Sequence, residues 1–97
     1  MKYFALLYEY LAVPDFVERR APFREEHLRL LRAAHAAGHV VMAGPFDDGP
    51  SGALIVFRGD SPEAAGPAEA FVREDPYVAQ GLVIRWQVKP WTIVVGA

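Results

Sequence analysis

Residues 2–10 read KYFALLYEY, and this stretch, rich in aromatic and aliphatic side chains, predicts the β-strand that decides the fold. Successive side chains of a strand point to opposite faces of the sheet. Tyr3, Ala5 and Leu7 therefore share one face, and the apolar residues between them share the other. Because both faces are apolar, we expect the sheet that contains this strand to be covered on both sides.

A helix over residues 22–37 is expected next, because Pro22 suits the first turn of a helix and Gly38 is a natural stop. Residues 15–20 add a separate short turn before it. Further strands are expected at 39–44, 53–58 and 82–89, the first two joined by a loop of turn-forming residues over 47–52.

The second helix is expected over residues 61–74, with Ser61 as its N-cap and Pro62 in its first turn. Gly66-Pro67 lies inside this segment and should kink or interrupt the helix. A short helical turn over 75–81 leads into the last strand. The resulting order, β-α-β-β-α-β, predicts an α+β, ferredoxin-like domain with a four-stranded antiparallel sheet and two helices on one face.

The second face of this sheet needs a cover of its own, because two helices can cover only one face. Strands 39–44 and 53–58 are also apolar on both sides. A strand with one face in water would instead alternate apolar and polar residues. An uncovered apolar face usually marks an interface. We therefore expect a homodimer or higher homo-oligomer in which sheet faces pack together. Loops and the C-terminal tail are the alternative cover, but they offer few residues.

Size, charge and composition narrow the class of protein. With 97 residues, the chain suits one domain, 1–97, and the absence of cysteine excludes disulfides and thiolate chemistry. A net charge of -2 with scattered arginines gives no nucleic-acid footprint. No apolar run has the length of a membrane span, and the first residues resemble a strand more than a signal peptide. We expect a cytoplasmic protein that binds neither nucleic acid nor membrane.

His27 is the sharpest candidate for chemistry. On a helical wheel it lies in the middle of the apolar stripe formed by Phe23, Leu30, Leu31 and Ala34. A histidine that faces the sheet needs a hydrogen-bond partner, and that partner sets its charge, which makes His27 a candidate general acid/base. A structural histidine is the alternative, and the commoner case by roughly two to one.

Two charged residues are candidate companions of His27. Asp75 precedes Pro76 at the start of a short turn, where it is either a plain N-cap or a carboxylate that orients His27. Arg24 lies one turn before His27 and is either solvated or holds an anionic group of a substrate. His35 lies off the apolar stripe, and no spacing of metal ligands such as His-x-x-x-His is present, so we expect no metal.

Other residues are candidates for the wall of a small-molecule pocket. Gly44 and Pro45 end a strand, where they either line a cleft or simply stop the strand. Tyr77, Trp86 and Trp91 are the candidate aromatic lining. Trp86 shares a strand face with apolar residues, so the core is its first expected place.

The chain resembles the YciI-like (YCII-related) family in motifs spread over essentially its whole length. Its opening strand is similar, REEHL at 24–28 fits the family's Arg-x-x-His-Leu helix motif, and AGP at 43–45 fits its Ala-Gly-Pro turn. DPY at 75–77 fits its Asp-Pro-Tyr/Phe segment, and VKPW at 88–91 fits its closing Val-x-Pro-Trp/Phe. The chain departs from the pattern at Glu25, where the family often has proline, and at Gly66-Pro67.

This resemblance implies a ferredoxin-like subunit of the dimeric α/β-barrel superfamily, which includes muconolactone isomerase-like enzymes. It also implies a His-Asp site, which falls here on His27 and Asp75. Family members with known activity are cofactor-free acid/base enzymes, including a dehydrochlorinase acting on a chlorinated hydroxyquinol. We therefore expect a cofactor-free lyase or isomerase acting on a small cyclic or aromatic molecule. A non-catalytic small-molecule-binding or assembly module is the alternative, because fold does not fix function.

Overall fold

The computed structural model describes residues 1–60 and 65–97 of the chain. Its elements are β1 (Lys2–Tyr10), α1 (Phe16–Arg20), the 3-10 helix η1 (Ala21–Phe23), α2 (Arg24–Ala36), β2 (Val40–Pro45), β3 (Gly52–Gly59), α3 (Gly66–Glu74), α4 (Pro76–Ala79) and β4 (Val83–Trp91). In none of the described helices is there an apolar stretch long enough to cross a membrane.

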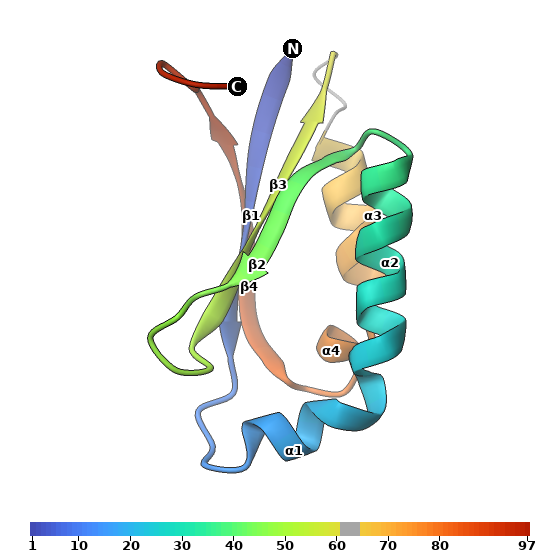
Figure 1. Cartoon of the computed structure of the whole chain (residues 1–97), viewed down its shortest axis with the longest axis vertical. Helices are drawn as coiled ribbons and strands as arrows, with labels where there is room; N and C mark the ends of the chain where they lie inside the picture. The colour runs from blue at the N-terminus through green and yellow to red at the C-terminus, as the bar shows by residue number, and fades with distance from the viewer. Residues whose placement is uncertain (61–64) are drawn as a thin grey trace.

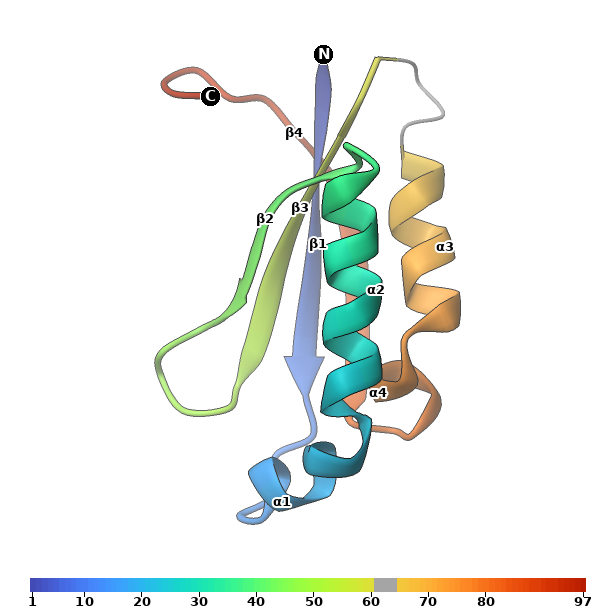
Figure 2. The ribbon, with the colours of Figure 1, turned by 45° about the vertical axis from the view of Figure 1, so that its right-hand side comes forward.

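The four strands form one antiparallel sheet in the order β2-β3-β1-β4. Helices α2 and α3 lie side by side on one face of this sheet, and the opposite face is open (Figures 1 and 2). The prediction of an α+β, ferredoxin-like domain with a four-stranded antiparallel sheet is therefore confirmed.

The helices differ from the sequence prediction mainly at their starts. The helix expected from Pro22 begins as the 3-10 helix η1 and becomes α-helical only at Arg24, so that α1, η1 and α2 follow one another without a gap. Helix α3, as described, begins at Gly66 and carries Pro67 in its first turn, where a proline is tolerated. The expected N-cap and first-turn proline of that helix, at 61 and 62, lie outside the described residues.

The core lies between the sheet and the helices. Alternate residues of β1, from Phe4 to Tyr10, point toward the helices and are at most 7% exposed. They pack with Ile55 and Phe57 of β3 and with Phe71 of α3 in a single apolar cluster. The alternation of β1 therefore buries one of its two apolar faces within the subunit, as the strand pattern requires.

The open face is apolar along three strands and polar along the fourth. Residues directly opposite each other on neighbouring strands share a face. Leu7 pairs with Leu54, and Met42 of β2 pairs with Val56, so aliphatic side chains run across β2, β3 and β1. Leu7 also pairs with Gln87 of β4, which brings a polar side chain to this face. The open face is thus an apolar surface with one polar border.

Trp86 is not in the core, and the expectation that placed it there is wrong. It pairs with Tyr8 of β1, yet 42% of Trp86 is exposed. The reason is its position on β4, which is an edge strand of the sheet. Local alternation predicts the face of a strand residue, whereas the exposure also depends on where the strand lies in the sheet.

Gly52 offers a test of the packing between β1 and β3. Its Cα carries no side chain, and a Cβ built there would meet the carbonyl oxygen of Tyr8 far inside van der Waals contact. We expect Gly52→Ala to lower the free energy of unfolding by about 1–3 kcal/mol, because the backbone of β1 has to move. Chemical denaturation measures the change.

Gly44→Ala is the matched control, since a Cβ at Gly44 of β2 would meet nothing within 4 Å. Its stability should stay within about 0.5 kcal/mol of the parent chain. Equal stabilities of the two variants would contradict the close approach of β1 to β3.

Candidate active site

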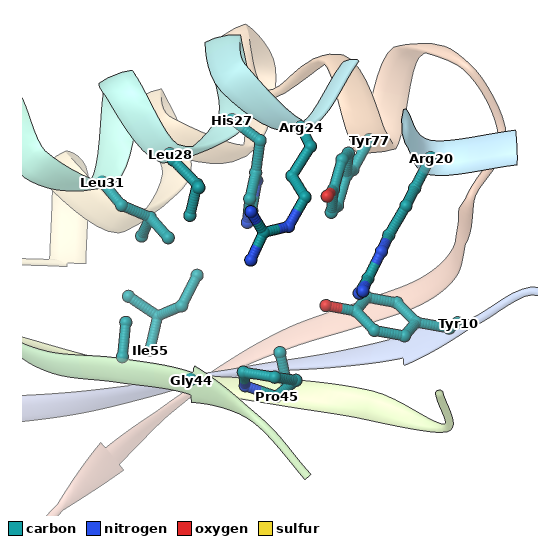
Figure 3. A pocket seen from close by; sticks show the side chains of 12 residues that line it. Tyr10, Arg20, Arg24, His27, Leu28, Leu31, Gly44, Pro45, Ile55 and Tyr77 are labelled. Carbon is teal, nitrogen blue, oxygen red and sulfur yellow. The ribbon is translucent and has the colours of Figure 1, made fainter. Parts of the chain in front are cut away.

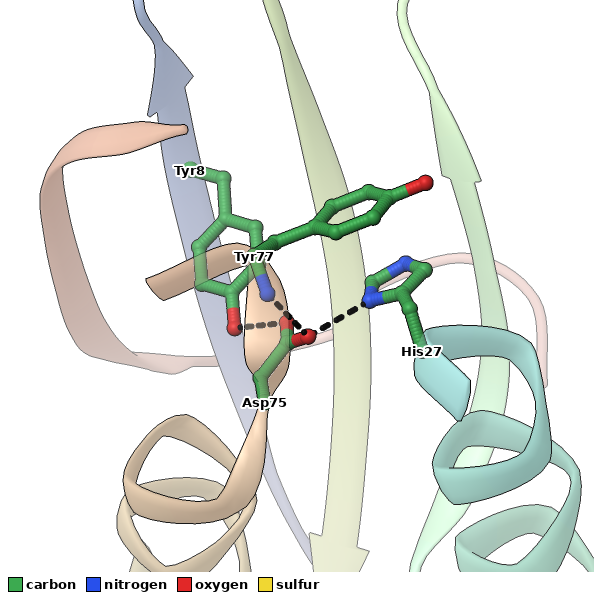
Figure 4. A network of polar contacts seen from close by, with 4 residues as sticks. All are labelled: Tyr8, His27, Asp75 and Tyr77. Atoms are coloured by element: carbon green, nitrogen blue, oxygen red, sulfur yellow. Dashed lines mark hydrogen bonds and ion pairs between the residues drawn. The ribbon is translucent and has the colours of Figure 1, made fainter. Parts of the chain in front are cut away.

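The carboxylate of Asp75 lies at the centre of the candidate site and is fully buried. It begins α4 as an N-cap, because one of its oxygens accepts a hydrogen bond from the Tyr77 amide at 3.1 Å. The same oxygen accepts from Nδ1 of His27 at 2.9 Å, and the other accepts from the Tyr8 hydroxyl at 2.7 Å (Figure 4). Asp75 is therefore both a cap and the partner of His27.

The ring of His27 is fixed by two neighbours besides Asp75. It stacks on the ring of Tyr77 with centroids 3.9 Å apart and planes 5° from parallel. Phe71 of α3 meets it edge-on, with centroids 6.1 Å apart. His27 is the buried residue of α2, and 7% of it is exposed. The position of the imidazole is therefore set by α3 and α4 as well as by its own helix.

The bond to Asp75 decides which nitrogen of His27 is free to react. A carboxylate only accepts hydrogen bonds, so Nδ1 carries the proton that it donates to Asp75. In the neutral imidazole this leaves the lone pair on Nε2, the nitrogen that Asp75 does not hold, and the imidazole belongs to a residue that lines a cavity. If Nε2 takes up a proton, the buried carboxylate stabilises the resulting imidazolium. The pair can therefore act as a general base, His27, held in place by an orienting carboxylate, Asp75.

A cavity of about 130 Å³ lies between α2 and the sheet (Figure 3). Its lining residues are Tyr10, Arg20, Arg24, His27, Leu28, Leu31, Ala43, Gly44, Pro45, Ala53, Ile55 and Tyr77. The structure thus brings together five residues singled out in the sequence, Arg24, His27, Gly44, Pro45 and Tyr77, and Asp75 is bonded to His27. Their catalytic and binding roles stay predictions.

The two tryptophans do not join this cavity, so the expectation that they line it is not met. Trp91 lines a separate cleft at the other end of β1, together with Tyr3 and Phe4. Trp86 lies on the edge strand β4 and is absent from the lining. The tyrosines at the cavity are Tyr77, which the sequence analysis named, and Tyr10, which it did not.

Tyr10 and Arg20 are lining residues that the sequence analysis missed. Arg20 was assigned to a separate turn, but α1, η1 and α2 are continuous. Arg20, Arg24, His27 and Leu31 follow one another at spacings of three or four residues, which is the signature of one helical face. A single helical stripe drawn across residues 16–36 would have found Arg20.

The cavity is basic, because Arg20 and Arg24 are its charged lining residues and none of its described lining residues is acidic. Burial raises the pKa of the Tyr10 hydroxyl to about 12, and the nearby Arg20 only partly offsets this. Burial likewise raises the pKa of Tyr77, against the opposing influence of Arg20 and Arg24. Both hydroxyls therefore stay protonated at neutral pH and are available as hydrogen-bond donors. Over the described residues no cluster of three or more metal-ligating side chains is found.

The Tyr8 hydroxyl is the third donor to Asp75 and gives the site a pH dependence. Burial, followed by the charge of Asp75, raises the pKa of Tyr8 far above its ordinary value. The folded state therefore holds this proton more tightly than the unfolded chain does, where tyrosine titrates near about 10. The contribution of the Tyr8 hydroxyl to stability is complete below about pH 10 and is lost as the pH rises above that value.

We expect Tyr8→Phe to lower the free energy of unfolding at pH 7 by about 1–3 kcal/mol, because Asp75 loses a buried donor. The loss of stability above about pH 10 should also be smaller in this variant than in the parent chain. Urea denaturation across this pH range measures both effects. An unchanged stability at pH 7 would contradict the role of Tyr8 as a partner of Asp75.

The fold is shared with solved structures of low sequence identity. The 5-chloro-2-hydroxyhydroquinone dehydrochlorinase TftG of Burkholderia phenoliruptrix AC1100, solved in complex with 2,5-dihydroxybenzoquinone, superposes with a TM-score of 0.72 at 19% identity over 93% of both chains. A NIPSNAP family protein of Agrobacterium tumefaciens strain C58 gives a TM-score of 0.62 at 14% identity, covering 94% of this chain and 90% of that one. At these identities the likeness concerns the fold alone.

Two sequence relatives have a higher identity to this chain than these solved structures have. The protein YciI of Escherichia coli O6:H1 is 34% identical over 86 residues, which is 79% of this chain and 85% of that protein. An uncharacterized protein of Haemophilus influenzae is 30% identical over 88 residues, covering 81% and 87% of the two chains. The model of the YCII-related domain matches residues 1–92. The chain therefore belongs to the YCII-related domain family.

Proposed function

We propose that this protein is a cofactor-independent acid/base enzyme of the lyase or isomerase type. In this enzyme His27 transfers the proton, and Asp75 orients the imidazole of His27. The observation that carries the proposal is the fully buried Asp75 carboxylate bonded to Nδ1 of His27 at 2.9 Å, with the same imidazole lining a cavity. A histidine with only a structural role does not need to line a cavity.

The proposed reaction begins with transfer of a proton from the substrate to Nε2 of His27. The bonding electrons stay on the substrate, and the positive charge on the imidazole is balanced by Asp75. The substrate then either expels a leaving group as an anion, after which His27 releases its proton to solvent, which is elimination, or takes the proton back at another atom, which is isomerisation. The three hydrogen bonds to Asp75 hold the carboxylate in place throughout the cycle.

The cavity suits a small ring as substrate. Its volume of about 130 Å³ is close to that of an engineered cavity of about 150 Å³ that binds benzene. Aliphatic side chains of Leu28, Leu31 and Ile55 provide an apolar wall for such a ring. The shared fold with a dehydrochlorinase adds support for elimination as the reaction type, although the likeness itself concerns the fold.

We further propose that the open face of the sheet joins two subunits in a homodimer. The support is the apolar surface across β2, β3 and β1, on which 66% of Met42 is exposed. Two sheets packed face to face, about 10 Å apart, would remove this surface from water. The candidate site lies on the other side of the sheet and would stay accessible.

The acid/base proposal predicts loss of turnover when either member of the pair is changed. A panel of hydroxylated and chlorinated ring compounds is incubated with the protein in D2O, and mass spectrometry reports deuterium uptake or release of chloride. We expect His27→Gln to slow the reaction by about 10²–10⁴-fold. Asp75→Asn should have a similar effect, because the amide can donate to Nδ1 and would move the proton to Nε2.

His35→Gln is the matched control, since His35 lies on the same helix but is exposed and away from this cavity. Its rate should equal that of the parent chain. If the parent chain turns over a compound and His27→Gln turns it over equally fast, His27 is not the base.

The dimer proposal predicts a mass of twice 10.8 kDa in light scattering at micromolar concentration. Met42→Glu should shift the protein toward the monomer, because it introduces a charge into the apolar face. Val17→Glu is the control, since Val17 is 52% exposed on α1, outside the sheet. A parent chain that stays monomeric would contradict the proposal.

A further inference from the structure

Two buried hydrogen-bond donors of this cavity have no partner among the described residues. They are Nε of Arg20 and the hydroxyl of Tyr77. Tyr77 itself is only 1% exposed, and both residues line the cavity beside His27 (Figure 3). A buried donor without an acceptor costs about 1–3 kcal/mol, so native structures rarely keep one without a reason.

The two unpartnered groups can be satisfied by the same kind of partner, which is a hydrogen-bond acceptor. A guanidinium nitrogen only donates, and a tyrosine hydroxyl whose pKa is raised stays protonated and able to donate. Other buried polar groups of the site are satisfied, since Asp75 accepts from Tyr8, His27 and Tyr77. The two buried groups without a partner therefore lie at the cavity, and both can donate a hydrogen bond.

The charge of the cavity identifies the kind of acceptor that is missing. Arg20 and Arg24 contribute two positive charges to the lining, and no described lining residue contributes a negative one. Neither arginine forms an ion pair with a described carboxylate, in contrast to the neighbouring Arg19, which pairs with Asp15 at 3.0 Å. An anionic oxygen would satisfy both the charge and the hydrogen-bonding capacity.

We propose that Arg20 and Tyr77 form an oxyanion subsite, assisted by Arg24, that binds the carboxylate, phenolate or enolate oxygen of a small ring substrate. This inference deepens the proposed function and rests on it for the role of His27. It narrows the substrate class from a small ring compound to one that carries an anionic oxygen.

The subsite would also serve the reaction itself. Tyr77 stacks on the imidazole of His27 at 3.9 Å, so an oxygen held by its hydroxyl places the attached ring close to Nε2. When His27 removes a proton from a conjugated ring, negative charge moves onto that oxygen. Fixed donors aimed at the developing charge lower the barrier, as in other oxyanion sites.

Calorimetric titration with benzoate and with its neutral isostere benzamide tests the subsite. We expect the parent chain to bind benzoate, with an affinity that falls as salt is added, and to bind benzamide at least about tenfold more weakly. Arg20→Gln should weaken benzoate binding about tenfold or more, because a charged hydrogen bond is lost. Arg19→Gln, one residue away and outside the cavity lining, should leave it unchanged.

Tyr77→Phe separates a binding role from a structural one. The change removes a buried hydroxyl without a partner but keeps the ring that stacks on His27. We expect the melting temperature to stay the same or rise, while benzoate binding weakens. His27→Gln should still bind benzoate, so that failure of the base and failure of the anion subsite can be told apart.

Three results with the parent and Arg20→Gln chains would overturn the subsite. They are equal affinity of the parent chain for benzoate and benzamide, no benzoate binding at millimolar concentration, and full benzoate binding by a folded Arg20→Gln chain. A Tyr77→Phe chain that binds benzoate normally but melts at a lower temperature would also overturn it, since Tyr77 would then have a structural role only.

Discussion

A single buried carboxylate organises the centre of this protein. Asp75 has no exposed surface, and an isolated buried charge costs several kcal/mol unless hydrogen bonds replace its water. Those bonds come from the side chain of Tyr8 on β1, the imidazole of His27 on α2 and the amide of Tyr77 on α4. Three elements that are distant in sequence must therefore meet at one point. The candidate site is a consequence of satisfying this charge.

Much of the fold was predictable because its causes are local. The two-faced pattern of residues 2–10 identifies β1, and Asp75-Pro76 marks the start of α4. The apolar stripe around His27 predicts that this histidine faces the sheet, and His27 is indeed the buried residue of α2. The distance between His27 and Asp75 was not predictable from spacing, because it depends on how α4 packs against α2.

The residues that sequence analysis missed or misplaced depend on non-local facts. Trp86 is half exposed because β4 is an edge strand, and strand order is a property of the whole sheet. Arg20 reaches the cavity because the 3-10 helix η1 joins α1 to α2 in one continuous run. A proline in a first turn, such as Pro22, usually marks the beginning of a helix. The helical run that reaches Pro22 from α1 was therefore not predicted.

The stack of Tyr77 on His27 restricts how protons can travel. Nδ1 of His27 is held by a carboxylate that has no contact with solvent, and one face of the imidazole is covered by an aromatic ring. A half-turn flip of the imidazole would place a carbon atom where Nδ1 now lies and would break the hydrogen bond to Asp75. Protons therefore reach the His-Asp pair at Nε2, the ring nitrogen that Asp75 does not hold. A molecule bound in the cavity would therefore exchange protons with one fixed nitrogen of the imidazole, and the geometry of the site selects which of its atoms can react.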